Sequence, residues 1–140
     1  MAGNWEQIAL VTKPSLTITY PWHYLCEIEG DWTRLRLTAH GRWNCLGDYF
    51  TPCGPEGYLG LSLATDRLFV PESAPGALLG KFGGSLAHRS DGAVFVIGPQ
   101  CIIAMPEKTP TILSIAVNGA VPRATNQVDL TLDISGIIDS

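Results

Sequence analysis

Apolar and polar residues alternate with a period of two along two stretches of this chain. In residues 128–134, Val, Leu and Ile alternate with Asp and Thr. In residues 33–39, leucines occupy one face and Arg34, Arg36 and Thr38 occupy the other. Because successive side chains of a β-strand point to opposite faces, each stretch predicts a half-buried strand.

Seven further short runs of apolar residues are each bounded by Gly, Pro, Asp or Asn. They cover residues 8–11, 16–20, 24–28, 77–82, 93–97, 101–105 and 111–117. The 15 glycines and 10 prolines leave few windows as long as an average helix of about 11 residues. Many short strands separated by turn residues are typical of an antiparallel β-sandwich or barrel. We therefore predict an all-β protein.

A long middle loop, residues 40–76, separates two of these predicted strands. Loops of this length in a compact domain usually carry function or are disordered. Aromatic residues favour a packed loop in this case: Trp43, Tyr49, Phe50, Tyr58 and Phe69. Internal repeats and low-complexity segments are not visible, and 140 residues is an ordinary size for one domain, so we expect a single domain over residues 1–140.

Composition and charge exclude several function classes. A hydrophobic content of 46% argues against disorder, and a charged content of 16%, against about 25% on average, suggests that part of the surface contacts a partner or another copy of the chain. The net charge of -4 and the scattered Lys and Arg residues predict no nucleic-acid binding. The charge-free stretches 92–106 and 109–122 fall short of the roughly 20 apolar residues of a transmembrane helix.

The N-terminal residues and the cysteines bear on where the protein is located. Residues 1–6 lack the basic and apolar regions of a secretory signal, so a cytoplasmic location is the default expectation, with signal-less export or association with a membrane complex as alternatives. Four cysteines are too few for a disulfide scaffold in a domain of this size. Free thiols are therefore expected, with a bridge between Cys45 and Cys53 as the alternative in an oxidising compartment.

Motifs of catalysis and metal binding are weak. Residues 83–87, Gly-Gly-Ser-Leu-Ala, end in Ala87 where a nucleophile elbow requires glycine. The three histidines, His23, His40 and His88, stand in no general-base motif. Cysteine pairs with zinc spacing, a calcium loop and a phosphate-binding glycine loop are all missing from the sequence. We therefore expect a protein that is not an enzyme.

Trp43 is the aromatic residue best placed for a role in binding. It precedes Asn44 and lies close to Asp48 in the long loop. The C–H face of a sugar ring packs on an aromatic face, and its hydroxyls need nearby amides or carboxylates. This combination favours a sugar-binding loop.

The order of features along nearly the whole chain resembles the LecA-like family, small bacterial galactophilic lectins with a calcium-dependent β-sandwich. The matching features are Trp5, Thr38-Ala39-His40-Gly41 followed by Trp43, the segment 76–83, the strand ending at Gly98, the segment 113–118 and the final strand to Ile134. The resemblance implies a jelly-roll-like antiparallel sandwich of the galactose-binding-lectin type.

The family's sugar and calcium share one site, and the resemblance places that site on particular residues here. Its Asn-Asp pair falls on Asn118-Gly119, its Asn-Asn pair on Thr125-Asn126 or Asn126-Gln127, and its carbonyl-donating Tyr on Cys45 or Leu46. Gly119 supplies no carboxylate, and calcium affinity falls as anionic ligands are removed. We therefore expect no metal and no other cofactor; if calcium is kept, its ligands are the Cys45 or Leu46 carbonyl, Asn118, Thr125 and Asn126.

Two functions from different classes follow. The first is a carbohydrate-binding module for galactoside-like glycans, whose site is lined by Trp43, Asn44, Asp48, Asn118, Thr125, Asn126 and Gln127. The second is an accessory subunit that uses the same fold to dock in a larger protein assembly, motivated by the low charge and the degraded calcium site. Either function is compatible with a homo-oligomer.

Overall fold

The computed structural model describes residues 4–17, 22–43, 53–59, 70, 72–82, 94–105, 111–119 and 127–139. Its regular elements are all strands, as the alternating pattern predicts. In chain order they are β1 (Glu6–Thr17), β2 (His23–Ile28), β3 (Arg34–Trp43), β4 (Leu78–Phe82), β5 (Val94–Val96), β6 (Gln100–Ala104), β7 (Thr111–Val117) and β8 (Gln127–Ile137).

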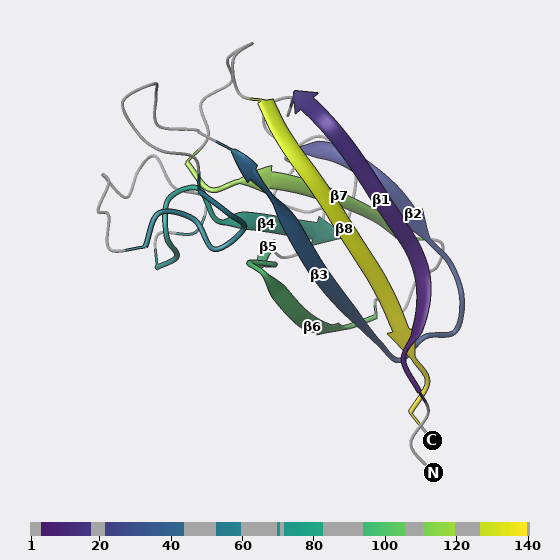
Figure 1. Cartoon of the computed structure of the whole chain (residues 1–140). Helices are drawn as coiled ribbons and strands as arrows, with labels where there is room; N and C mark the ends of the chain where they lie inside the picture. Colours follow the sequence, from purple (N-terminus) through teal and green to yellow (C-terminus); the bar gives the residue numbers. More distant parts are fainter. Residues whose placement is uncertain are drawn as a thin grey trace.

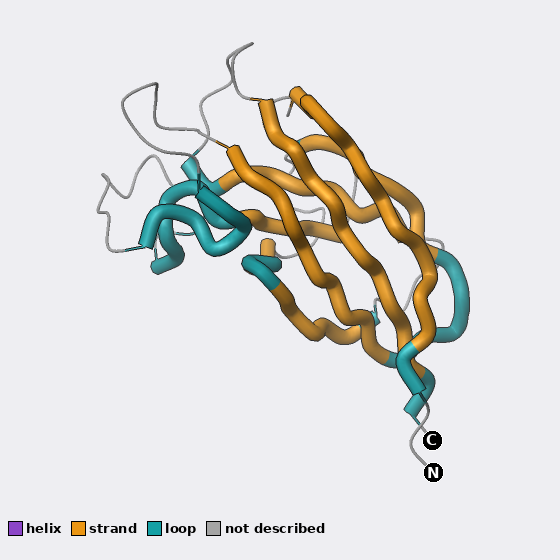
Figure 2. Tube along the Cα trace, in the orientation of Figure 1, coloured by secondary structure: helices purple, strands orange, loops and turns teal. Residues whose placement is uncertain are grey.

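The strands form two four-stranded antiparallel sheets. One has the order β1-β8-β3-β6 and the other the order β2-β7-β4-β5. Figure 1 shows the first sheet in front of the second, and the strands dominate the trace in Figure 2. The prediction of an all-β sandwich is confirmed. Eight strands divided between two sheets are the general plan of a jelly roll.

The core lies between the two sheets and follows from the alternation. In β3, Leu35, Leu37 and Ala39 are buried, while the intervening side chains are partly exposed. The register pairs Leu37 with Ile134 and Ala39 with Leu132, so the buried positions of β8 join those of β3 on the same face. From the second sheet, the core receives Leu25, Ile28, Leu78, Leu113, Ile115 and Val117. Burial of these apolar faces stabilises the sandwich.

Several strands are longer than the pattern predicts, among them β8, which runs to Ile137 instead of Ile134. β3 continues past Ala39 because β8 pairs with it as far as Trp43, opposite Val128. β1 joins the predicted runs 8–11 and 16–20 into one strand that contains Pro14, with a register shift between Lys13 and Leu16. β1 is an edge strand, and proline is tolerated at edges and bulges. Residues 18–20 of the second run lie outside the described residues.

The outer face of the second sheet carries a small separate apolar cluster. Trp22, Leu79 and Ala116 are buried there, with Val70 packed against them. The buried Lys81 lies on this face with its Nζ 5.3 Å from the centre of the Trp22 ring. A cation above an aromatic face is attracted by the ring's electrons.

Candidate ligand-binding groove at one end of the sandwich

A short folded segment, residues 53–59, stands beside the last residues of β3. Trp43 and Cys53 exchange two backbone hydrogen bonds, of 3.0 and 2.9 Å, in an isolated β-bridge. The Gly57 N–H then donates to the Gly54 carbonyl at 3.0 Å, closing a turn with Pro55 at its second position. Proline's fixed φ suits that position of a β-turn.

This segment is also tied to the start of the second sheet. The Leu78 N–H donates to the Pro55 carbonyl at 2.9 Å, and the Tyr58 N–H donates to the Pro75 carbonyl at 2.7 Å. Residues 53–59 are therefore held by hydrogen bonds to β3 on one side and to the region of β4 on the other. They form a firm wall beside the sheet.

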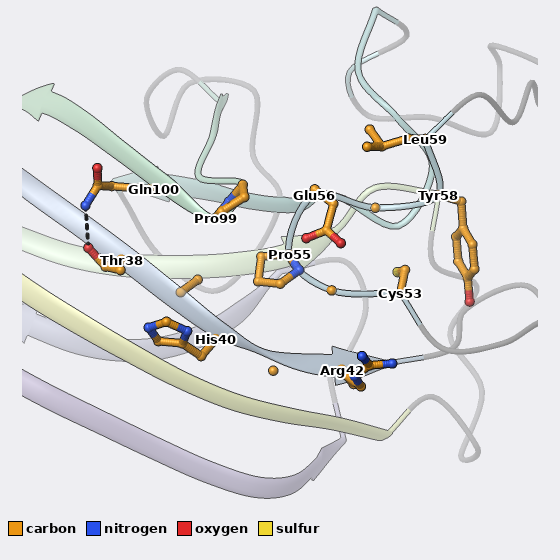
Figure 3. Close-up of a pocket in the computed structure, with 14 residues that line it drawn as sticks. Thr38, His40, Arg42, Cys53, Pro55, Glu56, Tyr58, Leu59, Pro99 and Gln100 are labelled. Atoms are coloured by element: carbon orange, nitrogen blue, oxygen red, sulfur yellow. Dashed lines mark hydrogen bonds between the residues drawn. The ribbon is translucent and has the colours of Figure 1, made fainter.

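Between this wall, the second half of β3 and the start of β6 lies an open groove of about 880 Å³, here called the end groove. Its lining residues are Thr38, Ala39, His40, Gly41, Arg42, Cys53, Gly54, Pro55, Glu56, Gly57, Tyr58, Leu59, Pro99 and Gln100. Figure 3 shows Pro55 and Glu56 between Pro99 at one end and Cys53 at the other. Three separate parts of the chain build this groove.

The end groove combines hydrogen-bonding groups with apolar walls. The Gln100 Nε2 donates to the Thr38 Oγ1 at 3.0 Å, which fixes the amide at one end. His40, Arg42 and Glu56 are exposed and offer an imidazole, a guanidinium and a carboxylate. The β3–β8 register places Arg42 opposite Asp129, so positive and negative groups are mixed here. Such a surface can donate to and accept from a neutral polar ligand.

The cysteines near the core are chemically quiet. Burial raises the pKa of the Cys53 thiol to about 11, and the nearby Glu56 charge adds to the rise. Burial also raises the pKa of Cys101 to about 11. Cys26, Cys53 and Cys101 are free thiols, and Cys45 lies outside the described residues. Since the thiolate is the nucleophile, raised pKa values argue against reactive thiols at Cys53 and Cys101.

Asn118, a predicted site residue, is fully buried and its amide is engaged by the backbone. Its Oδ1 accepts from the Val70 N–H at 3.1 Å, and its Nδ2 lies 3.0, 3.3 and 3.2 Å from the Val70, Ser73 and Ala74 carbonyls. One side chain thus provides hydrogen-bond partners for the backbone of Val70, Ser73 and Ala74. In the structure, Asn118 organises the loop before β4.

Trp43, also predicted as a binding residue, is buried, with 3% of its surface exposed. Its indole N–H donates to the Gly76 carbonyl at 2.7 Å, and the Gly76 N–H donates to the Asn118 carbonyl at 2.7 Å. The structure therefore brings Trp43 and Asn118 together through Gly76. Trp43 and Asn118 thereby help to hold the segment of residues 53–59 that forms the wall of the end groove.

The remaining predicted residues are only partly described. Gln127 begins β8 and pairs with Thr17 through its backbone. Because Trp43 pairs with Val128, Gln127 lies at the same end of the sandwich as Trp43, where β3 and β7 also end (Figure 1). Asn44, Asp48, Thr125 and Asn126, and the alternative carbonyl donors Cys45 and Leu46, lie outside the described residues.

Most of the side chains that line the end groove are absent from the predicted site. The prediction does not include Arg42, Glu56 or Gln100, and it gives His40 no role. A signal for the β3 residues was available, because the even positions of residues 34–38 continue outward to His40 and Arg42 if the strand runs to Trp43. The approach of Glu56 depends on the Trp43–Cys53 bridge, which no local pattern indicates.

Among the described residues, no group of three or more His, Cys, Asp or Glu side chains is arranged to hold a metal ion, and no helix is long and apolar enough to cross a membrane. A scan against protein-family models finds no match for the chain, and a search of curated proteins finds no significant relative.

Proposed function

We propose that this protein is a carbohydrate-binding module that holds a galactoside-like glycan in the end groove. The observation that supports this proposal is the composition of the groove: several fixed or exposed hydrogen-bonding side chains stand between walls of Pro55, Pro99 and Leu59. Sugar hydroxyls need such donors and acceptors, and the C–H faces of the ring need apolar contacts. The resemblance to galactophilic lectins points to the same ligand class.

The position of the groove adds support. Trp43 and Cys53, the described residues that flank positions 44–52, are bridged beside the groove. Asn44 and Asp48 follow Trp43 in the sequence, which favours a loop-end site near the end groove. No calcium ion is part of this proposal; of the ligands expected if calcium is kept, the Asn118 side chain is engaged by backbone groups, and Cys45, Leu46, Thr125 and Asn126 lie outside the described residues.

The experiment is a glycan array followed by calorimetric titration with methyl β-galactoside, each with calcium and with chelator. We expect binding, weakened about tenfold or more by Glu56→Ala and by Gln100→Ala, because a lost hydrogen bond to a polar or charged group costs about 1.4 kcal/mol or more. Thr12→Ala is the matched control, an exposed polar residue on β1 of the same sheet, and should change affinity less than twofold.

Flat titrations with every glycan, with and without calcium, would contradict the proposal. The alternative function, docking of the fold in a larger assembly, has less support in the described residues. Their exposed large apolar side chains are spread over several strands and loops: Leu10, Tyr24, Leu59, Val94, Val96, Ile102 and Ile138. Scattered exposed apolar residues are normal on soluble proteins, so these side chains alone do not favour a docking face.

A further inference from the structure

The floor of the end groove is a gap in the backbone pairing of β3. In an antiparallel strand, alternate residues direct their N–H and C=O toward the same neighbour. The Ala39 N–H donates to the Pro99 carbonyl at 2.8 Å, and Trp43 exchanges two hydrogen bonds with Cys53. Gly41 lies midway between Ala39 and Trp43, so its N–H and C=O face the same side, into the groove.

Pro99 makes this gap wider. A regular ladder would return a hydrogen bond from residue 99 to the Ala39 carbonyl, but proline has no N–H. Among the residues that the structure describes, none is hydrogen-bonded to the Ala39 carbonyl or to the Gly41 backbone across the groove. The floor therefore presents an acceptor at Ala39, followed by a donor and an acceptor at Gly41.

The gap is too short for an added peptide strand. It is closed on one side by Pro99 and on the other by the Trp43–Cys53 bridge, which leaves Gly41 as the one residue between them. Strand addition gains affinity from a row of main-chain hydrogen bonds. A small ligand with a few hydroxyls needs only the backbone groups that this one residue offers.

We propose, on the basis of the proposed function, that the Gly41 backbone binds a pair of adjacent hydroxyls on one sugar ring. One hydroxyl accepts from the Gly41 N–H, and its neighbour donates to the Gly41 carbonyl. A hydroxyl can do either, because it carries one donor hydrogen and two acceptor lone pairs. The Ala39 carbonyl accepts from a third hydroxyl or a bound water. The lateral contacts then come from Glu56 and Gln100.

The test uses the wild-type chain labelled with ¹⁵N. Methyl β-galactoside is titrated while the Gly41 amide resonance is followed, and the 2-, 3-, 4- and 6-deoxy derivatives are then compared by calorimetry. We expect a saturable shift of the Gly41 amide, and an affinity loss of about tenfold for removal of either of two adjacent ring hydroxyls. Gly30, in the connection from β2 to β3, serves as the control amide and should not shift.

The possible failures separate the two proposals. If the galactoside binds while the Gly41 amide stays fixed, or if no adjacent pair of hydroxyls matters, the Gly41 inference is overturned and the carbohydrate function stands. If no sugar on the array binds, both are overturned. A shift of Gly41 caused by an extended peptide and by no sugar would also overturn the inference, in favour of edge-strand recognition.

Discussion

At the residue scale, the Asn118 amide supplies hydrogen bonds that backbone groups before β4 would otherwise lack. From a fully buried position its Oδ1 accepts from one N–H, and its two amide hydrogens are shared among the carbonyls of Val70, Ser73 and Ala74. Buried backbone groups that lose their partner cost about 1–3 kcal/mol each, so this side chain stabilises far more than its own contact area suggests. A residue expected to bind ligand is, in the structure, a support of the loop.

We predict that Asn118→Ala lowers the free energy of unfolding by about 2 kcal/mol or more, measured by urea denaturation. Asn118→Asp should be at least as damaging, because a carboxylate would face three carbonyl oxygens. Glu72→Ala, an exposed change in the same segment, is the control and should stay within about 0.5 kcal/mol of the original chain. Equal stability of all three variants would show that the amide is dispensable.

Gly41 is constrained by close packing as well as by its backbone conformation. A Cβ at this position would lie 1.9 Å from the Asp129 carbonyl oxygen, and its φ is 152°. Gly98 also has a positive φ, 57°, but a Cβ there would meet nothing closer than 3.9 Å. The pair separates steric conflict from backbone strain.

We predict that Gly41→Ala lowers the free energy of unfolding by about 3 kcal/mol, since clash and strain add. Gly98→Ala should cost about 1 kcal/mol, the strain of a left-handed residue alone. Urea denaturation of the two variants side by side checks the difference. Equal losses would mean that β8 moves away from β3 without cost.

At the scale of elements, the strands could be predicted because each one carries its own pattern. Leu35 and Leu37 alternate with polar residues, and so do Leu130, Leu132 and Ile134. The local sequence is therefore enough to predict which face of each strand is buried. The prediction failed at ends that depend on a distant partner. Gly41 interrupts the apolar positions after Ala39, and pairing with β8 extends β3 through residues 40–43.

The end groove could not be predicted for the same reason. Trp43 reads as an exposed sugar platform next to Asn44, but its indole donates to Gly76, 33 residues further along the chain. Glu56 and Gln100 reach the groove because a bridge to Cys53 and a ladder to β6 bring them to β3. Local sequence shows which residues are polar; tertiary pairing decides which of them share a cavity.

At the scale of the whole molecule, β1 begins and β8 ends at the end of the sandwich opposite the groove (Figure 1). Arg34 joins them. Its Nε and Nη2 donate to the two Asp139 oxygens at 2.8 and 3.0 Å. Its guanidinium carbon, and that of Arg36, lie 5.7 and 4.9 Å from the centre of the Trp5 ring. A bidentate ion pair and a cation–π stack thus fasten both termini to β3.

This ion pair gives the molecule a predicted dependence on pH. The hydrogen bonds from Arg34 hold the pKa of Asp139 below its usual range. A carboxyl whose folded pKa is lowered contributes stability above its unfolded pKa, about 3.9, and loses that contribution as the pH falls through the folded value. We therefore expect Asp139→Asn to lower the melting temperature slightly at pH 7 and to have a smaller effect as the pH falls through the lowered pKa of Asp139. High salt should shrink the difference at pH 7, because both side chains are exposed.

The control is the same substitution in an Arg34→Gln background. If Asp139 acts through Arg34, Asp139→Asn changes nothing further there at any pH. A pH-dependent effect that persists without Arg34 would assign the acid sensitivity to another partner of Asp139. Persistence of the effect in 1 M salt would instead point to packing of the terminus, through the Asp139 N–H donated to Thr33 Oγ1 at 3.1 Å.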